Sequence, residues 1–280
     1  MSDVASRDRL AAAAYTAPAM LYLGLLFLVP MAVVAGYSLR DPTGGVTLAH
    51  YQRALDPLYV AVLLRSARLA LVTTMIALAV GYPCALALRA MSGRARAVAL
   101  ALVVLPSWLN LLVKNYAWIV ILRRQGVLNT ILLATGVIDA PLPLLFNDWA
   151  VLTGLVHTYL PFMVLPLYAA VDRMDGTLLE AARDLGAGRW HTFLHVVLPQ
   201  TRTGALVGTV LVFIPTLGAF VTPDLLGGAR SLMIANLIEN QVLQARNWPF
   251  AAALSMFLIA LVLLALAALH RATRGREAVL

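Results

Sequence analysis

The chain alternates between long apolar runs and shorter polar segments that hold most of its charged residues. Each apolar run is near the roughly 20 residues that a helix needs to cross the hydrocarbon core of a membrane. The alternating pattern of membrane β-barrel strands is not found, and backbone groups in lipid must bond within their own segment, which favours helices. The pattern predicts six transmembrane helices, at about residues 15–39, 64–90, 97–121, 149–171, 202–223 and 248–270.

The composition agrees with this pattern, because 61% of the 280 residues are hydrophobic and only 12% are charged. An ordinary soluble domain of this length holds more charge. The fold class expected is therefore an all-α integral membrane protein. Residues 1–280 are expected to form a single transmembrane domain, since no internal repeat or low-complexity tract divides the chain.

The net charge of +8 would suggest nucleic acid as the partner of a soluble protein, but arginines at the ends of membrane spans have a simpler cause. Cytoplasmic segments of membrane proteins carry an excess of Lys and Arg. The excess falls on the inner segments if both termini are cytoplasmic. The charge therefore predicts a multi-pass protein with its N and C termini in the cytoplasm and no nucleic-acid partner.

Helix breakers lie at mid-depth in several predicted spans. They are tolerated where neighbouring helices or a water-filled cavity satisfy the freed carbonyls, so they predict kinked helices suited to a transport path, although proline is frequent in membrane helices generally. Gly204 and Gly208 form a GxxxG pair, which permits two helices to approach closely. The breakers are Pro30, Gly81 with Pro83, Pro106, Pro161 with Pro166, and Pro215 with Gly218.

The polar segment 172–201, called the elbow below, separates the fourth and fifth predicted spans. Thr177 and Glu180 have the spacing of a capping box, in which each side chain bonds to the backbone N–H of the other residue. This spacing predicts a short helix over about 178–185.

The second half of the elbow contains both turn and helix signals. Gly186 and Gly188 can take the left-handed conformation that ends a helix. A second helical pattern then runs to Leu198 and Pro199, where the proline is expected to halt it. The elbow is therefore predicted to be two short helices joined by a glycine turn.

The elbow also carries a signature of fixed spacing: Glu-Ala-Ala, three residues, Gly, nine residues, an aliphatic residue, one residue, and Leu-Pro. It resembles the cytoplasmic signature of the membrane subunits of ATP-binding-cassette importers, with Val196 where Ile is more usual. The resemblance implies that these residues couple the chain to an ATPase. The matching residues are Glu180, Ala181, Ala182, Gly186, Val196, Leu198 and Pro199.

Most of the chain resembles the spermidine/putrescine-type family of importer permeases. The resemblance implies the MetI-like fold of a type I importer in a bacterial inner membrane. It also implies a second permease subunit that completes a heterodimer, two ATPase subunits that bind ATP and Mg, and an extracytoplasmic solute-binding protein. The segments that carry it are 82–88, 105–122, 159–187 and 213–228.

The sequence itself supports this division of labour. A Walker A loop needs a lysine after its glycines to reach the phosphates, and Lys114, the only lysine in the chain, follows Leu-Leu-Val. The chain is therefore expected to be a transport subunit rather than an enzyme and to hold no cofactor of its own. The energy must come from a partner.

A polyamine substrate would call for acidic and aromatic side chains, because ammonium groups are attracted to carboxylates and to ring faces. Each candidate could instead be an interfacial anchor or a loop residue. Lys114 would repel a polycation unless it is paired, and it could snorkel or bind Asp148. The candidates for the substrate path are Trp108, Tyr116, Trp118, Asp148, Asp224 and Glu239. Another cationic or amino-acid-derived solute stays an alternative.

Two features of the sequence could indicate another class of function, a metalloenzyme or an ion-driven transporter. His191 and His195 have the spacing of a zinc-protease motif, but Thr192 occupies the place of the general base, so no metal is expected. An ion-driven transporter would need ionisable residues in mid-membrane, where the apolar runs offer His157 alone, and this residue is interpreted as a packed, hydrogen-bonded histidine.

Overall fold

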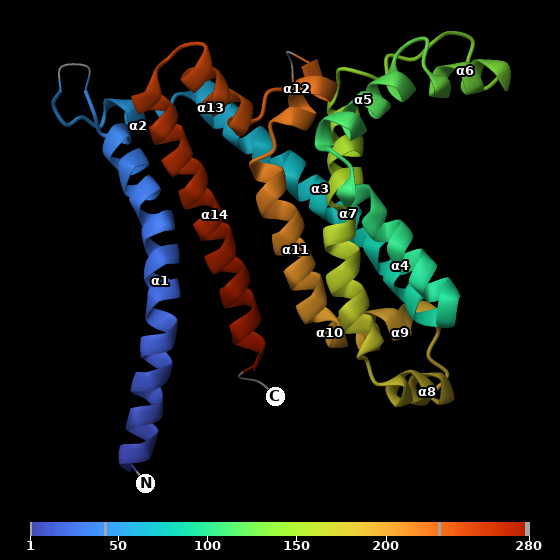
Figure 1. Ribbon diagram of the computed structural model, residues 1–280. Coiled ribbons are helices and arrows are strands. Elements are labelled where there is room, and N and C mark those ends of the chain that lie inside the picture. Colours follow the sequence, from blue (N-terminus) through green and yellow to red (C-terminus); the bar gives the residue numbers. More distant parts are fainter. Residues whose placement is uncertain (1, 42–43, 229–230, 278–280) are drawn as a thin grey trace. The chain divides into compact units, whose positions relative to one another are not determined.

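The computed structural model describes residues 2–41, 44–228 and 231–277, with side chains over 15–41, 44–228, 231–267 and at 271. Within these ranges the regular elements are all helices, and the only strand-like pairing is an isolated bridge between Arg40 and Val46 (Figure 1). The all-α fold expected from the sequence is therefore confirmed.

The longer helices are α1 (Ser2–Ser38), α3 (Pro57–Ala90), α4 (Gly93–Trp108), α5 (Leu111–Leu122), α7 (Asp148–Asp172), α11 (Arg202–Leu217) and α14 (Trp248–Glu277). The shorter ones are α2 (Ala49–Ala54), α6 (Val127–Ala134), α8 (Gly176–Asp184), α9 (Arg189–Thr192), the π-helical turn η1 (Phe193–Val197), α10 (Leu198–Gln200), α12 (Val221–Gly227) and α13 (Ile234–Leu243). Over the described residues, five helical segments are long and apolar enough to cross a membrane, and α11 with the helical residues before it gives a sixth if that bent pair is one span.

The predicted third span, 97–121, is not one helix. The helix α4 ends at Trp108, Leu109 is extended with φ −76° and ψ 141°, and α5 begins at Leu111. Pro106 lacks an N–H to continue the helical ladder, and the side chain of Asn110 accepts a hydrogen bond from the N–H of Leu112, which starts a new helix. The break therefore comes from a proline followed by a cap.

Two other spans differ from their predicted bounds. The second begins at Pro57 rather than at 64, with proline in the first helical position where its missing N–H costs nothing. The fifth was predicted to reach 223, but α11 ends at Leu217, where Pro215 and the C-cap Gly218 weaken the ladder, and α12 starts anew at Val221. By contrast, α7 continues as one helix through Pro161 and Pro166.

The chain divides into two compact units, one formed by Met1–Asp56 with Ile238–Ala260 and the other by Pro57–Leu237 with Leu261–Leu280. In the first unit, aromatic side chains join the elements: the Tyr51 and Phe257 rings lie 5.7 Å apart, and the Arg53 guanidinium lies 4.4 Å from the centre of the Phe250 ring. This unit holds α1, α2, the end of α13 and the first part of α14.

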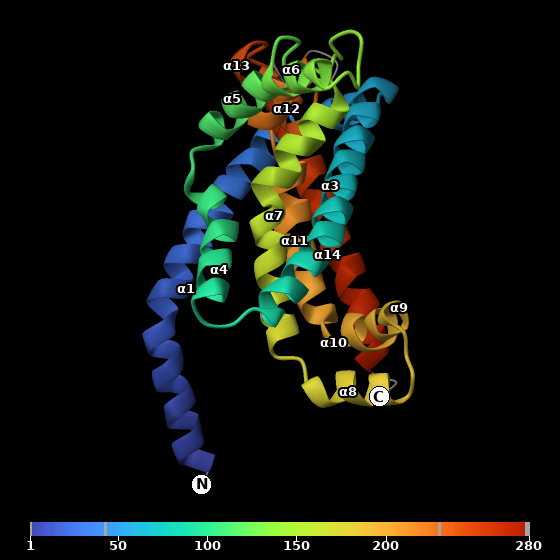
Figure 2. The ribbon, with the colours of Figure 1, turned by 90° about the vertical axis from the view of Figure 1, so that its right-hand side faces the viewer.

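The second unit is built on α3, α7 and α11, which pack against one another (Figures 1 and 2). Glycines allow the close approach: a Cβ on Gly204 would lie 2.5 Å from the Ala170 Cβ, and one on Gly208 would lie 2.6 Å from the Met163 Sδ. The predicted role of the GxxxG pair is confirmed. Because the backbones touch here, larger side chains would push α7 and α11 apart.

Two clusters of buried apolar residues lie within this unit. One cluster, around Met163, Leu167 and Val197, reaches the elbow. The other, around Leu155 and Leu226, lies toward the N-terminal end of α7. The unit therefore has a core at each end of α7, and each core supports one of the polar sites described next.

Candidate functional site

The first helix of the elbow begins differently from the prediction. Its N-cap is Asp175, whose carboxylate accepts a hydrogen bond of 3.0 Å from the N–H of Thr177. Bonding to Thr177 holds the pKa of Asp175 below its usual value, because the bond favours the ionised carboxylate. The predicted capping box of Thr177 and Glu180 is therefore wrong: Thr177 already lies inside α8, and Glu180 is exposed. An Asp two residues upstream is the stronger acceptor.

The end of α8 follows the prediction at one glycine and departs from it at the other. Gly186 has φ +74°, and the bonds from Gly186 N to Arg183 O and from Ala187 N to Ala182 O, both 2.9 Å, form a Schellman motif. Gly188 instead has φ −68° and is the extended N-cap of α9. Only Gly186 therefore needs the conformational freedom of glycine.

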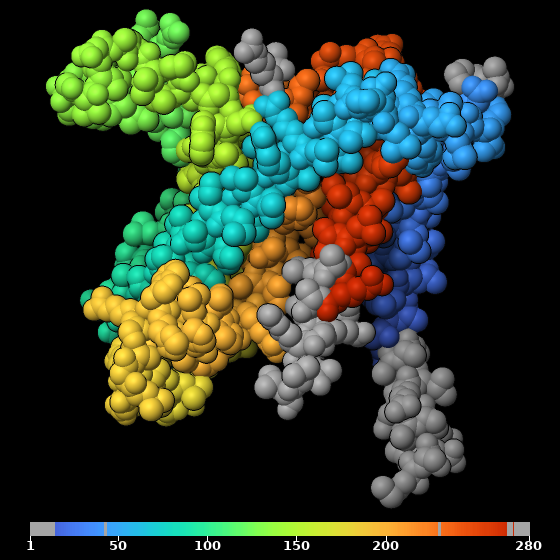
Figure 3. Space-filling view, turned by 180° about the vertical axis from the view of Figure 1, so that it is seen from behind, coloured from blue at the N-terminus to red at the C-terminus, as the bar shows by residue number. Residues whose placement is uncertain are grey.

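One side of α8 packs on the second unit, and its other side is open. Ala182 is buried and Leu179 packs on the buried cluster, while Glu180 and Ala181 are exposed. The exposed residues include Leu185, whose side chain is 87% exposed, an unusual position for a leucine on a polar loop. In Figure 3 the elbow, in gold, protrudes beyond the surface of α3 and α4. The helix therefore presents a mixed apolar and charged face to its surroundings.

The helix predicted in the second half of the elbow does not end at Pro199. Helical structure continues through η1 and α10 to Gln200, and the chain then bends by 74° into α11. The break lies at the buried Thr201, whose hydroxyl donates to the Val197 carbonyl at 2.7 Å and lies 3.1 Å from the Tyr82 hydroxyl. Pro199 sits in the first turn of α10, where its missing N–H is not needed.

The signature residues of this half face different surroundings. Val196 and Leu198 are half-buried and Pro199 is exposed, and Leu198 packs on the cluster that contains Tyr82. Aromatic rings join the elbow to α3: Phe193 meets Tyr82 edge to face at 5.2 Å and stacks on Trp190 at 5.7 Å. The second half of the elbow is therefore fastened to the helix core, while α8 is more open.

The sequence reading missed a residue that holds the start of the elbow. Arg89, in the last turn of α3, donates from its two terminal nitrogens to the carbonyls of Val171 at 2.8 Å and Met174 at 3.0 Å. These carbonyls lie at the C-terminal end of α7, where the helix has no backbone donors left. The only sign of this role in the sequence is a basic residue at the end of a predicted helix. That sign does not identify the carbonyl it binds, because Val171 lies 82 residues away.

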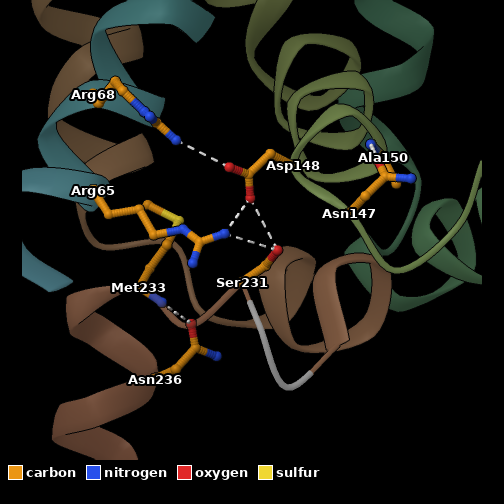
Figure 4. Close-up of polar contacts among 8 residues, drawn as sticks. All are labelled: Arg65, Arg68, Asn147, Asp148, Ala150, Ser231, Met233 and Asn236. Carbon is orange, nitrogen blue, oxygen red and sulfur yellow. Dashed lines mark hydrogen bonds and ion pairs between the residues drawn. The ribbon is translucent and has the colours of Figure 1, made fainter. Parts of the chain in front are cut away.

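At the other end of α7, Asp148 is already neutralised within the chain (Figure 4). Its carboxylate accepts hydrogen bonds from Arg65, from Arg68 at 3.1 Å and from the Ser231 hydroxyl at 3.0 Å. Two guanidinium groups on one carboxylate leave it poorly suited to hold a cationic solute. The prediction that Asp148 is free to meet a substrate is therefore not supported by this geometry.

The same end of α3 also binds the start of α13 and the residues just before it. The N–H of Ile234 donates to the Ser66 hydroxyl at 2.7 Å, and the Asn236 amide donates to the Phe220 carbonyl at 2.8 Å. Together with Ser231, these bonds tie residues 231–236 to α3, to α7 and to the start of α12. We call Arg65, Arg68, Asp148 and Ser231 the Asp148 cluster.

The structure does not bring the other predicted path residues together. Trp108 is 85% exposed at the end of α4, and Tyr116 and Asp224 are also exposed, whereas Glu239 is half-buried on the part of α13 that belongs to the first unit. Among the candidates outside the Asp148 cluster, Trp118 has a polar partner within the described part of the chain: its indole N–H donates to His157 Nδ1 at 3.2 Å. His157 is thus hydrogen-bonded, as expected.

His191 and His195 stack with their ring centres 4.0 Å apart, and His195 Nδ1 lies 3.1 Å from the His191 carbonyl. Within the part of the chain that the structure describes, no three His, Cys, Asp or Glu side chains gather as a metal site would require. The pair thus offers at most two ligands.

Comparison with known proteins agrees with this architecture. The family model described as binding-protein-dependent transport system inner membrane component matches residues 77–274, and the chain belongs to this family. Its members are membrane components of transporters, so the chain is a transport subunit and not an enzyme.

Individual relatives are similar over most of their length. The spermidine/putrescine transport system permease protein PotB of Escherichia coli K12 is 42% identical over 259 residues, which cover 90% of this chain and 94% of the relative. The protein of the same name from Haemophilus influenzae is 39% identical over 264 residues, or 91% and 92% of the two chains. A bacterial ABC transporter that imports the acidic polysaccharide alginate shares the fold, with a TM-score of 0.71 and 19% identity over 96% of each chain.

Proposed function

We propose that this chain is a permease subunit of an ATP-driven polyamine importer, with spermidine or putrescine as the solute. The observation that carries the proposal is the 42% identity to the spermidine/putrescine permease over 90% of the chain. The expected partners are a second permease subunit, two ATPase subunits that bind ATP and Mg, and an extracytoplasmic solute-binding protein. In this arrangement both termini and the elbow lie in the cytoplasm, and the Asp148 cluster lies on the outer side.

The geometry of the elbow supports a coupling role. The helix α8 is held at its start by the Asp175 cap and at its end by the Gly186 turn, and the Arg89 guanidinium fixes the carbonyls before it. A short helix held at both ends with one face open can move as a unit when a partner pushes on it. We infer that closure of the ATPase pair displaces α8 and that α3, α7 and α11 transmit this movement to the path.

The path would then open alternately to each side of the membrane. The loaded binding protein docks on the outer loops, ATP closes the ATPase pair, and the helices open outward to receive the solute. Hydrolysis of ATP restores the inward-facing state. Within this chain, α7 and α11 are in backbone contact at Gly204 and Gly208, so these two helices would move together.

The solute can be tested directly. The complex is isolated with its binding protein, and the thermal unfolding of that binding protein is followed in the presence of spermidine, putrescine and acidic or neutral control compounds. We expect stabilisation by a polyamine, because a ligand that binds the folded state raises the melting temperature. Stabilisation by a control compound alone would contradict the polyamine proposal.

The coupling role can be tested with a matched pair of carboxylates on α8. Glu180 and Asp184 are both exposed. We expect Glu180→Gln to leave the complex assembled but to lower the ATPase activity stimulated by binding protein about tenfold or more, as for loss of a charged hydrogen bond. Asp184→Asn is the control and should keep that activity. Equal activity of the two variants would argue against a role for Glu180.

A further inference from the structure

The helix α5 has a polar stripe on its buried side. Lys114 is only 7% exposed and Asn115 only 1%, and Trp118 lies one turn further along, half-buried. This side of α5 packs on α7 and α12, where the Asn115 amide donates to the Thr222 hydroxyl at 3.2 Å. Lys114 is therefore largely covered by the second unit rather than displayed on its surface.

Lys114 has no counterion among the residues whose side chains the structure describes. It makes no hydrogen bond or ion pair with another residue that the structure describes, and Asp148, its one candidate partner, is held by Arg65 and Arg68. A buried ammonium without a partner is unfavourable by several kcal/mol in general. The charge therefore calls for an acceptor from outside the chain.

The position of Lys114 in its helix strengthens this requirement. Its N–H makes the first helical bond of α5, to the carbonyl of the N-cap Asn110 at 3.1 Å. The N-terminal end of a helix carries partial positive charge, so a cation is disfavoured there and an anion is favoured. The lysine and the helix end both favour the same kind of ligand.

The neighbouring polar groups are also donors. The Trp118 indole can only donate, so His157 Nδ1, which it contacts at 3.2 Å, must be the accepting nitrogen of a neutral ring. The proton of that ring then lies on Nε2, which becomes a donor. Lys114 and Trp118 are four residues apart on α5, so the Lys114 side chain lies on the same side of the helix as the indole that contacts His157. A diamine offers only further donors and positive charge to this group, whereas a carboxylate offers acceptors and negative charge.

We propose that Lys114 and His157 form a site for a carboxylate on the transported solute, so that the importer also takes amines that carry a carboxylate group. The inference rests on the proposed transport function, because it assumes that a solute reaches the region where α5 meets α7 and α12. A carboxylate of the companion permease has the same chemistry, and the experiment below separates the two sources.

Putrescine and 4-aminobutyrate are a suitable pair of probes, because they have similar length and differ in one terminal aminomethyl group replaced by a carboxylate. The whole transporter with its binding protein is reconstituted in vesicles, and ATP-dependent uptake of each labelled compound is measured. Lys114→Met removes the charge at similar size, Lys114→Arg keeps it, and Arg124→Met removes an exposed charge beyond the end of α5 as the control.

We expect Lys114→Met to lower uptake of 4-aminobutyrate at least about tenfold, as for loss of a charged hydrogen bond, and to leave uptake of putrescine unchanged or higher. Lys114→Arg and Arg124→Met should resemble the unmodified complex. An equal loss of both uptakes in Lys114→Met overturns the site. Failure of that variant to co-purify with the companion permease also overturns it and assigns the acceptor to that subunit.

A second measurement separates the site from the proposed function. The complex without binding protein is placed in lipid nanodiscs, and its thermal unfolding is followed with each probe. Stabilisation by 4-aminobutyrate that is lost in Lys114→Met supports the carboxylate site, whatever the uptake results. If neither compound is taken up, or if only 4-aminobutyrate is taken up, the polyamine proposal fails while the site stands. Absence of both uptake and stabilisation by 4-aminobutyrate overturns the carboxylate site, whatever happens to putrescine.

Discussion

Two glycines in the elbow, two positions apart, differ in backbone conformation, and only one of them needs the conformational freedom of glycine. Gly186 adopts φ +74° to end α8, while Gly188 adopts φ −68°, which any residue can take. The sequence predicted a left-handed turn at both positions, since the pattern shows only that a helix stops nearby. Which glycine takes the turn depends on the hydrogen bonds that Ala182 and Arg183 receive, and these are fixed only in the folded elbow.

The pair gives a matched test at the scale of one residue. A Cβ at either glycine would meet no atom within 4 Å, so an alanine differs between them only in backbone strain. We expect Gly186→Ala to destabilise the end of α8 by about 1 kcal/mol and to reduce ATPase stimulation by the binding protein, and Gly188→Ala to do neither. Amide hydrogen exchange over 182–187, with the ATPase assay, provides the measurement. Similar exchange in the two variants would contradict the role given to the left-handed turn.

At the scale of elements, long-range polar contacts were the part of the structure that sequence patterns could not supply. The apolar runs indicated the helices because hydrophobicity decides which segments can span lipid. The partners of Asp148 lie 80 and 83 residues away on α3, so nothing in the local sequence around Asp148 identifies them. The break between α4 and α5 was missed for a different reason, because the hydropathy of a segment does not show where an N-cap such as Asn110 starts a new helix.

The Asp148 cluster should stabilise the joint between α3, α7 and the segment before α13. We expect Asp148→Asn to lower the thermal stability of the complex, by about 1 to 2 kcal/mol, because Arg65 and Arg68 would be left near each other with a weaker acceptor. Asp224→Asn, at an exposed carboxylate on α12, is the control and should change stability little.

The same two variants also separate a structural role from substrate binding. If Asp148 held the solute, Asp148→Asn would raise the KM for polyamine uptake without a change in the unfolding temperature. That result would contradict the assignment of Asp148 to the joint.

At the scale of the whole molecule, the family and the helical class could be predicted because both rest on local evidence: apolar runs and a signature of fixed spacing within the elbow. The predicted substrate path could not be assembled in the same way. Its residues were chosen by chemical type, and the structure places Trp108, Tyr116 and Asp224 at exposed positions while it buries Lys114. Side chains of the right type mark a path only when the fold, and the companion subunit, bring them to one surface.

The open face of α8 has a consequence for the degradation of the chain before it joins a complex. A subunit that has not met its partners displays Leu178 and Leu185 on a polar loop, next to the acidic Glu180. Exposed apolar side chains are the feature by which chaperones and proteases sort unfinished proteins. If this surface receives an ATPase, as proposed above, we expect it also to mark a subunit that has not been assembled, so that the supply of the ATPase sets how long each newly made chain survives.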